Sequence, residues 1–267
     1  MLIYNIRIQM YPKNSNFALT MEQIITTYPL GDGIEAFVVT RGRVDISDSY
    51  SGINVCHYVH DDPAHVRASR EEVCRRLGIG ADALVVPRQI HSADVAVLIG
   101  GALSPDGVDA VVTGLSDVAI GVSTADCVPV VMADASSGLI AASHAGWRGA
   151  LAGIVDNTLD AMTAYGASLS ETKVFIGPCI CQSCFEVGEE VAALFPDDFV
   201  SRDYGTKPHV DLPGYVRSQL AAHGVPEAAI QGPIDCTRCN PRQYFSARRL
   251  GINSGRTFTG IIRRQKT

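Results

Sequence analysis

Hydrophobic residues occur along this chain in short runs that are rich in β-branched side chains. Seven such runs lie at residues 37–40, 83–86, 95–98, 108–112, 118–122, 128–133 and 139–143. Runs of this length and composition are typical of strands buried within a sheet. The pattern therefore predicts seven strands, most of them buried.

Longer amphipathic segments alternate with these runs and predict helices. Residues 64–77 follow Asp62, a good N-cap, and Pro63, which suits a first helical turn, and they end at Gly78, a common C-terminal residue. A second helix is predicted over residues 148–165, where apolar side chains recur on one face and polar ones on the other.

The alternation of strand and helix signals predicts the fold class. It indicates an α/β protein, a layered α/β/α single domain with a mixed β-sheet. Two further helices are expected around residues 186–194 and 213–223. No repeat, low-complexity tract or linker divides the chain, so we expect one domain.

Composition and charge narrow the class of protein. With 267 residues, 46% of them hydrophobic, the chain can bury a full core. A net charge of −6 argues against a nucleic-acid-binding surface and favours a small-molecule substrate. No run approaches the roughly 18 apolar residues of a membrane span. The eight cysteines, with no signal peptide ahead of them, indicate a reducing compartment and a cytoplasmic protein.

Three short segments each carry one metal-binding side chain: His91 in residues 88–91, Cys127 in residues 124–129 and His144 in residues 144–149. Two imidazoles and one thiolate, with a fourth position left to water, are the ligands of a catalytic zinc site. Spacings of 36 and 17 residues are too long for a zinc finger. They fit a site assembled where separate strands end, although isolated histidines and thiols also occur in cores.

A second interpretation uses two of the same residues as a cysteine hydrolase. Cys127 would be the nucleophile and His144 its base, which requires a thiolate within hydrogen-bonding distance of an imidazole. The additional imidazole of His91 favours the metal site, because a nucleophilic dyad does not need it.

A second group of cysteines has the spacing of a zinc ribbon. Cys181 and Cys184 form one CxxC pair, and Cys236 and Cys239 form another 52 residues later. The two pairs offer a structural zinc site. For these residues, and for Cys179, the sequence alone favours packed or redox-sensitive thiols.

The candidates for acid–base chemistry and anion binding are one carboxylate and several arginines. Arg148 begins the predicted helix after His144, where free N–H groups and the positive helix end suit a phosphate. Asp126 precedes Cys127 and points to the opposite side of an extended segment, so it either takes part in catalysis or supports the site. The weaker candidates are side chains that ordinarily lie on the solvent-exposed surface without a functional role: Arg70, Arg248, Arg249, Glu186 and His57.

Together with residues 106–110, 176–178, 185–188 and 245–249, the three segments resemble the signature of the YfiH-like family, also called laccase-domain or polyphenol oxidase-type proteins. The resemblance covers nearly the whole chain from about Met21, which makes residues 1–20 an N-terminal extension and residues 21–267 the metal-dependent catalytic domain. It implies phosphorolysis of adenosine, inosine, guanosine and methylthioadenosine, with purine nucleosides and phosphate as substrates. It also implies deamination of adenosine, with zinc as the metal.

Two other functions remain open beside this one. The older family name suggests a copper-dependent polyphenol oxidase, but the seven histidines include no His-x-His pair of the kind that blue-copper oxidases use. Copper is still an alternative metal, because nitrogen and sulfur ligands bind Cu(II) more tightly than Zn(II). A non-catalytic metal-binding scaffold is the other alternative, since the motif defines ligands better than turnover.

Overall fold

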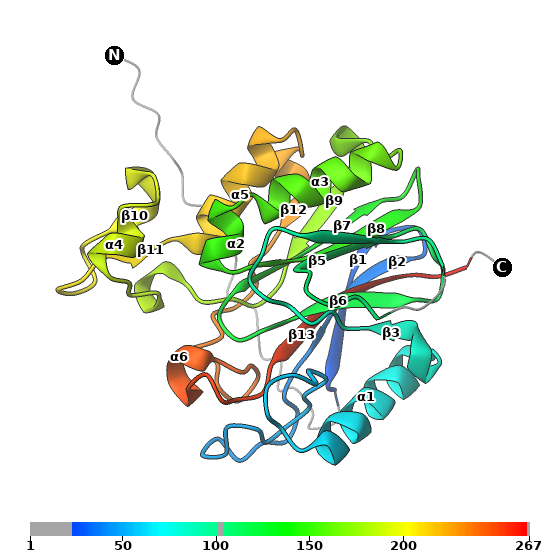
Figure 1. Ribbon diagram of the computed structural model, residues 1–267, viewed down its shortest axis with the longest axis horizontal. Coiled ribbons are helices and arrows are strands. Elements are labelled where there is room, and N and C mark those ends of the chain that lie inside the picture. Colours follow the sequence, from blue (N-terminus) through cyan, green and yellow to red (C-terminus); the bar gives the residue numbers. More distant parts are fainter. Residues whose placement is uncertain (1–22, 101–103, 266–267) are drawn as a thin grey trace.

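The computed structural model describes residues 23–100 and 104–265, and two mixed β-sheets lie at its centre (Figure 1). The first sheet has five strands in the order β1-β2-β13-β6-β3, antiparallel except for the parallel β6–β3 pair. Its strands are β1 (Ile25–Gly31), β2 (Ile34–Val39), β13 (Thr257–Arg263), β6 (Ala119–Thr124) and β3 (Leu84–Val85).

The second sheet has six strands in the order β12-β9-β7-β8-β5-β4, with parallel pairs at its two edges and antiparallel pairs between them. These strands are β12 (Ile230–Gln231), β9 (Lys173–Ile176), β7 (Val128–Asp134), β8 (Leu139–Ala145), β5 (Ala110–Thr113) and β4 (Val95–Leu98). A separate two-stranded ribbon joins β10 (Val200–Ser201) and β11 (His209–Val210).

Helices cover the outer faces of the two sheets (Figure 1). Helices α3 and α5 lie over the six-stranded sheet, and α1 lies under the five-stranded sheet. The α-helices of the described residues are α1 (Pro63–Leu77), α2 (Trp147–Leu151), α3 (Ile154–Ala164), α4 (Glu189–Ala192), α5 (Leu212–Ala222) and α6 (Ala247–Leu250).

Three apolar cores hold these four layers together. The middle core lies between the two sheets, where Ile120 and Ile261 of one sheet join Val131 and Phe175 of the other. The other two cores fill the spaces between each sheet and its helices. Strands β7 and β8 are buried along their whole length because one face meets the other sheet and the opposite face meets helices. This explains why their sequences are continuously apolar rather than alternating.

The structure confirms the α/β class and the helical outer layers, with one difference in the middle. The predicted single mixed sheet is two mixed sheets packed face to face. Each of the seven predicted runs overlaps a strand, with ends that differ by a few residues. Since a run buried on both faces has no alternation, it does not reveal which sheet it joins.

The first predicted helix is confirmed together with both of its ends. Asp62 accepts a hydrogen bond from the backbone N–H of Ala64, Pro63 lies in the first turn, and Gly78 ends α1 in the left-handed conformation at φ 66°. Helix α5 is also confirmed, whereas the helix expected around residues 186–194 is only the four-residue α4.

The prediction of one continuous helix over residues 148–165 is wrong. The segment forms α2 and α3, separated at Gly153, which has a φ of 86°. That left-handed conformation is inexpensive only for glycine, and it ends one helix before the next begins. The break leaves α2 beside the end of β8 and lets α3 pack along the sheet.

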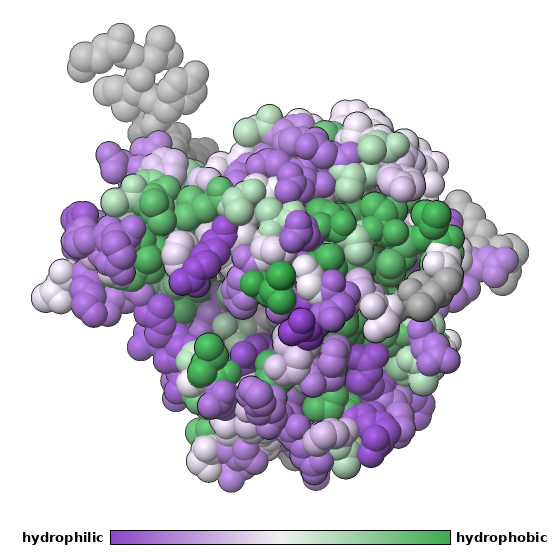
Figure 2. All heavy atoms as spheres, viewed as in Figure 1, coloured by the Kyte–Doolittle hydropathy of each residue, from purple (hydrophilic) through white to green (hydrophobic). Residues whose placement is uncertain are grey.

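The surface combines hydrophobic and hydrophilic regions. Hydrophobic residues gather over the upper part of the face in Figure 2, whereas the region around α1 is mainly hydrophilic. Among the described residues, no helix combines the length and the apolar character needed to cross a bilayer. The predicted N-terminal extension, residues 1–20, lies outside the described residues.

Candidate metal centre

The three predicted metal ligands converge. One ligand atom each from His91, Cys127 and His144 lies within 4.8 Å of the others. The pairing of β7 with β8 explains part of this, because Pro129 lies opposite His144 and so brings the residue before β7 close to the end of β8. His91 comes from the loop that follows β3.

Asp109, the residue before β5, holds the loop that carries His91. Its side chain is fully buried and accepts hydrogen bonds from the backbone N–H groups of Ile90 at 3.1 Å, His91 at 3.0 Å and Ser92 at 2.7 Å. His91 itself has a φ of 62°, which is uncommon outside glycine. The carboxylate therefore stabilises an unusual backbone conformation that turns an imidazole toward the site.

The same carboxylate orients His144. The Nδ1 atom of His144 lies 2.7 Å from Oδ1 of Asp109, and both side chains are buried. With Nδ1–H donating to the carboxylate, Nε2 is the ring nitrogen left for a metal or for Cys127. Burial raises the pKa of Asp109, but the hydrogen bonds and charge of His144 and the backbone N–H groups lower it to about 2. Asp109 is therefore ionised at neutral pH.

Cys127 and His144 form a charged pair in the absence of metal. Burial raises the pKa of the Cys127 thiol, but the charge and hydrogen bond of His144, together with His91, lower it to about 6. Burial lowers the pKa of His144, whereas the thiolate and Asp109 raise it to about 9. The pair is thus a thiolate beside an imidazolium, and a metal cation would replace the imidazolium proton.

Gly146 closes the site from the side of α2, where it is the N-cap. A Cβ atom at this position would lie 2.9 Å from the His91 ring and 3.2 Å from the Cys127 sulfur. The ring centroids of His91 and His144 are only 4.8 Å apart. The three ligands therefore meet around a position where only glycine fits.

These donors suit a single metal ion. Zinc bonds of about 2.0–2.1 Å to nitrogen and 2.3 Å to sulfur place tetrahedral ligands roughly 3.3–3.6 Å apart. The separations of up to 4.8 Å come close to this spacing, and the side chains need only small movements to reach it. Two imidazoles and a thiolate leave one tetrahedral position for water or substrate, and the same donors also accept copper.

Asp126 lies beside the site, but its carboxylate accepts hydrogen bonds from neighbouring loops. Its Oδ1 accepts a hydrogen bond from the Thr237 hydroxyl at 2.7 Å, and its Oδ2 accepts one from the backbone N–H of Arg248 at 2.7 Å. Its own carbonyl accepts from the N–H of Ile180 at 2.9 Å. Asp126 therefore ties together three loops and fixes the residue that precedes Cys127.

Arg148 remains exposed on α2, with its guanidinium 4.1 Å from the centre of the Trp147 ring. Because α2 spans only five residues, it has little of the helix dipole that the sequence suggested for an anion.

The weaker candidates lie outside the ligand cluster. Arg70 donates to the carbonyl of Leu84, and it lines a 410 Å³ pocket with His57 along α1. Arg248 donates to the carbonyl of Glu186, and Arg249 is exposed on α6.

The role of Asp109 does not follow from the strand pattern. The residue interrupts the apolar run 108–112, whose composition predicts only a buried strand. A carboxylate inside such a run must be paired or hydrogen-bonded, so the run itself contained a signal for a buried polar partner.

The fold and site together define a class: a two-sheet α/β protein in which two imidazoles and one thiolate converge as a candidate metal site. The chain belongs to the family described as multi-copper polyphenol oxidoreductase laccase, whose model matches residues 35–264. This confirms the resemblance found from the motifs.

Relatives and solved structures agree with this assignment. The chain is 47% identical over 249 residues to "Adenosine deaminase RL5" from an unknown prokaryotic organism, covering 87% of this chain and 95% of the relative. It is 37% identical over 247 residues to "Purine nucleoside phosphorylase" from Bacteroides thetaiotaomicron, covering 86% and 91%. The crystal structure of the Bacillus licheniformis hypothetical protein YfiH superposes with a TM-score of 0.81 over 86% of this chain and 93% of that one. At 23% identity, that last likeness supports the fold alone.

Proposed function

We propose that this protein is a purine nucleoside phosphorylase that also deaminates adenosine, with a zinc ion held by His91, Cys127 and His144. The observation that carries the proposal is the convergence of the three ligand atoms. Three protein ligands on a tetrahedral zinc ion would leave its fourth position to water or substrate. The names of the relatives supply the substrate class, because one is called an adenosine deaminase and another a purine nucleoside phosphorylase.

The chain's own residues have distinct tasks in this proposal. When bound, zinc would supply Lewis acidity toward water or a phosphate oxygen. Asp109 orients His144, while Asp126 fixes the position of Cys127 through its three loop contacts. Arg148, exposed on α2 after the second histidine, is the proposed partner of the substrate phosphate.

The first experiment separates the two reactions and the competing functions. Adenosine is incubated with zinc-loaded protein, with and without phosphate. Free adenine that requires phosphate indicates phosphorolysis, and inosine in both samples indicates deamination. If neither product forms, the proposal is wrong and the non-catalytic scaffold is favoured.

His91→Ala distinguishes the metal site from a cysteine hydrolase. The variant removes one metal ligand but leaves Cys127 beside His144, so a hydrolase dyad stays intact. We expect loss of the zinc ion held by this site and of both nucleoside activities. Activity that persists in this variant, or in chelator-treated wild-type protein, would favour the dyad.

The family description keeps copper oxidation as a second candidate function. The same donors bind Cu(II), so copper-loaded protein should be tested for phenol oxidation beside zinc-loaded protein. Nucleoside turnover with zinc and phenol oxidation only with added copper would make oxidation a side reaction.

Arg148→Ala tests the anion contact. Removal of one charge-assisted contact of roughly 1.5–3 kcal/mol should raise the KM for phosphate by about 10- to 100-fold, with zinc content unchanged. Arg75→Ala, an exposed arginine on α1, is the matched control and should change neither. An unchanged phosphate KM in Arg148→Ala would direct the test to Arg70, Arg248 and Arg249.

We also propose a reducing compartment, the cytoplasm, for this protein. The eight cysteines are unpaired in the structure, and the metal centre needs one of them as a thiolate. Reducing conditions maintain thiols in this state.

A further inference from the structure

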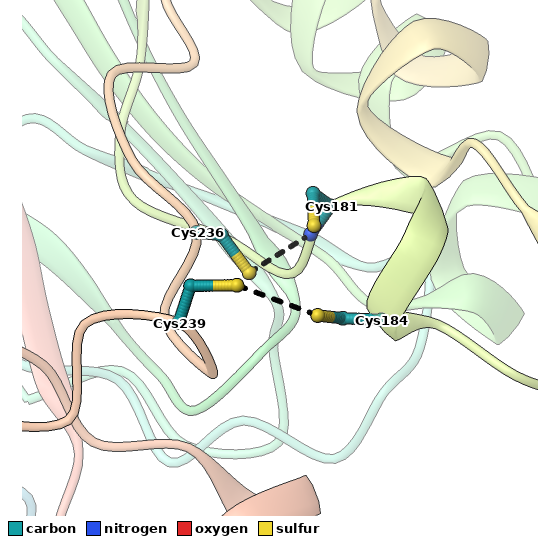
Figure 3. A group of neighbouring side chains, drawn as sticks. All are labelled: Cys181, Cys184, Cys236 and Cys239. Atoms are coloured by element: carbon teal, nitrogen blue, oxygen red, sulfur yellow. Dashed lines mark hydrogen bonds between the residues drawn. The ribbon is translucent and has the colours of Figure 1, made fainter.

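Four cysteines outside the His91–Cys127–His144 centre also converge on one another (Figure 3). The sulfur atoms of Cys181, Cys184, Cys236 and Cys239 all lie within 4.8 Å of one another, and those of Cys184 and Cys239 are 3.5 Å apart. They come from two loops, one after β9 and the other after β12. We call these four residues the cysteine cluster.

We propose that the cysteine cluster binds a structural zinc ion. Zinc–sulfur bonds of about 2.3 Å in a tetrahedron place the sulfur atoms roughly 3.8 Å apart. The four sulfurs are already close to that spacing, so small side-chain movements complete the geometry. With sulfur at all four positions the site is closed, as structural rather than catalytic zinc sites are.

The backbone around the first CxxC pair has the form of a tight turn. The N–H groups of Cys184 and Phe185 both donate to the carbonyl of Cys181, at 3.0 and 3.1 Å. The N–H of Cys181 donates in turn to the sulfur of Cys236 at 3.4 Å, as Figure 3 shows. A backbone N–H that points at sulfur stabilises a thiolate, because hydrogen bonds to a charged acceptor are the stronger ones.

The second CxxC pair forms a similar turn. Asn240 donates to the carbonyl of Cys236 from its backbone N–H at 3.1 Å and from its side-chain amide at 2.9 Å. The guanidinium of Arg238, inside this pair, interacts with Cys184 of the other loop. Four thiolates around Zn²⁺ carry a net charge of −2, and a neighbouring cation partly offsets it.

Packed thiols, which the sequence alone favoured, do not fit this environment as well. Cys184 is buried, and Cys181 and Cys236 pack against the core between the six-stranded sheet and its helices, but Cys239 is exposed, so burial in the core does not account for all four side chains. They face one another across two loops instead. Convergence of all four on one point is what a single tetrahedral ion requires.

The cysteine cluster supports the position of Asp126, next to the catalytic ligand Cys127. The two loops pair directly, since Cys179 and Cys236 form a parallel bridge. Ile180, the neighbour of Cys181, donates to the Asp126 carbonyl, and Thr237, the neighbour of Cys236, donates to the Asp126 carboxylate. Zinc in the cysteine cluster would therefore fix both loops that hold this residue.

Metal counting on the full chain tests the proposal without any activity assay. Wild-type protein purified without chelator should contain two zinc ions per chain by elemental analysis. His91→Ala should retain one, and Cys181→Ser/Cys184→Ser should also retain one. Cys74→Ser, which alters a buried cysteine between α1 and the five-stranded sheet, is the control and should retain two.

X-ray absorption on the His91→Ala variant identifies the ligands of the remaining ion. The His91→Ala variant keeps the whole cysteine cluster, so this measurement tests the proposal even if the double cysteine variant does not fold. We expect four sulfur neighbours at about 2.3 Å from zinc.

Three results would overturn the proposal. The first is His91→Ala protein without metal, and the second is iron in place of zinc. The third is an intact mass lower by two hydrogens for each disulfide, which would show that the cysteines are oxidised in pairs. None of these measurements depends on nucleoside turnover. The test of the cysteine cluster therefore remains valid even if the proposed nucleoside activity is absent.

Discussion

Replacement of Asp109 by asparagine tests whether one carboxylate organises the metal centre. Asparagine has nearly the same shape, but it offers one acceptor oxygen and an NH₂ group in place of two acceptor oxygens. Oδ2 of Asp109 accepts from Ile90 and Ser92, while Oδ1 accepts from His91 and His144. Whichever way the amide is oriented, at least two donors face NH₂.

The expected loss follows from these contacts. Two charge-assisted hydrogen bonds at roughly 1.5–3 kcal/mol each give about 3–6 kcal/mol of lost unfolding free energy. The pKa of Asp109 falls from 3.8 to about 2, which corresponds to roughly 2.4 kcal/mol and measures only the advantage of the charged over the neutral acid. We therefore expect Asp109→Asn to lose about 3 kcal/mol, or about 6–12 °C in Tm. Zinc affinity should fall about 10- to 100-fold, because His91 and His144 lose their support.

Asp134→Asn is the matched control for this measurement. Asp134 is also fully buried, accepts hydrogen bonds from Ser136, Ser137 and Ser168, and lies at the opposite end of β7 from Cys127. It should lose comparable stability with unchanged zinc affinity. Both variants are compared by thermal unfolding and by competition with a zinc-binding dye. If Asp109→Asn keeps wild-type zinc affinity while its Tm falls like that of Asp134→Asn, the carboxylate does not organise the metal centre.

Three further predictions concern packing, pH and the N-terminal segment. Gly146→Ala should lose the zinc ion of the His91–Cys127–His144 site, because the new Cβ lies 2.9 Å from the His91 ring. Gly80→Ala is the control, because Gly80 has nearly the same φ (−68° against −69°) and no atom within 4 Å of the added Cβ, so it should keep that ion. Equal zinc content in the two variants would contradict this prediction. Burial raises the pKa of Asp134, but hydrogen bonds from its serine partners lower it from 3.8 to about 2, so its stabilisation, about 2 kcal/mol, is present above pH 4 and lost as the pH falls through 2. Urea unfolding should show the gap between wild type and Asp134→Asn closing over that range, and a constant gap would refute the assignment. Protein that begins at Met21 should keep the Tm and zinc content of the full chain, and a Tm lower by several degrees would show that residues 1–20 contribute to the fold.

The parts of the fold that were predicted correctly depend on local chemistry. Helix α1 has its N-cap, its proline and its terminal glycine within the segment itself, so sequence suffices to place both ends. The break at Gly153 is different, since glycine is tolerated inside a helix and only packing against the sheet decides whether it turns. The division into two sheets depends on long-range pairing such as β13 with β6, which no local pattern contains.

The metal centre divides in the same way. The convergence of His91, Cys127 and His144 was predictable from their ligand types only together with their places at strand ends and the family resemblance, because isolated histidines and thiols are also common in cores. The partners of Asp109 and Asp126 were not predictable, since each carboxylate bonds to segments that are distant in the sequence. The convergence of the two CxxC pairs likewise depends on how two loops meet.

The three candidate ligands differ in exposure, so the candidate metal centre has an outer side and an inner side. His91 is exposed, Cys127 is partly buried and His144 is buried. A zinc ion that enters the proposed site from solvent would therefore meet the His91 imidazole first and the two inner ligands afterwards, and a departing ion would follow the reverse order. In the proposed zinc site, the outer imidazole would then govern the rate of metal exchange, while the thiolate and the carboxylate-supported histidine in the interior would govern the strength of binding.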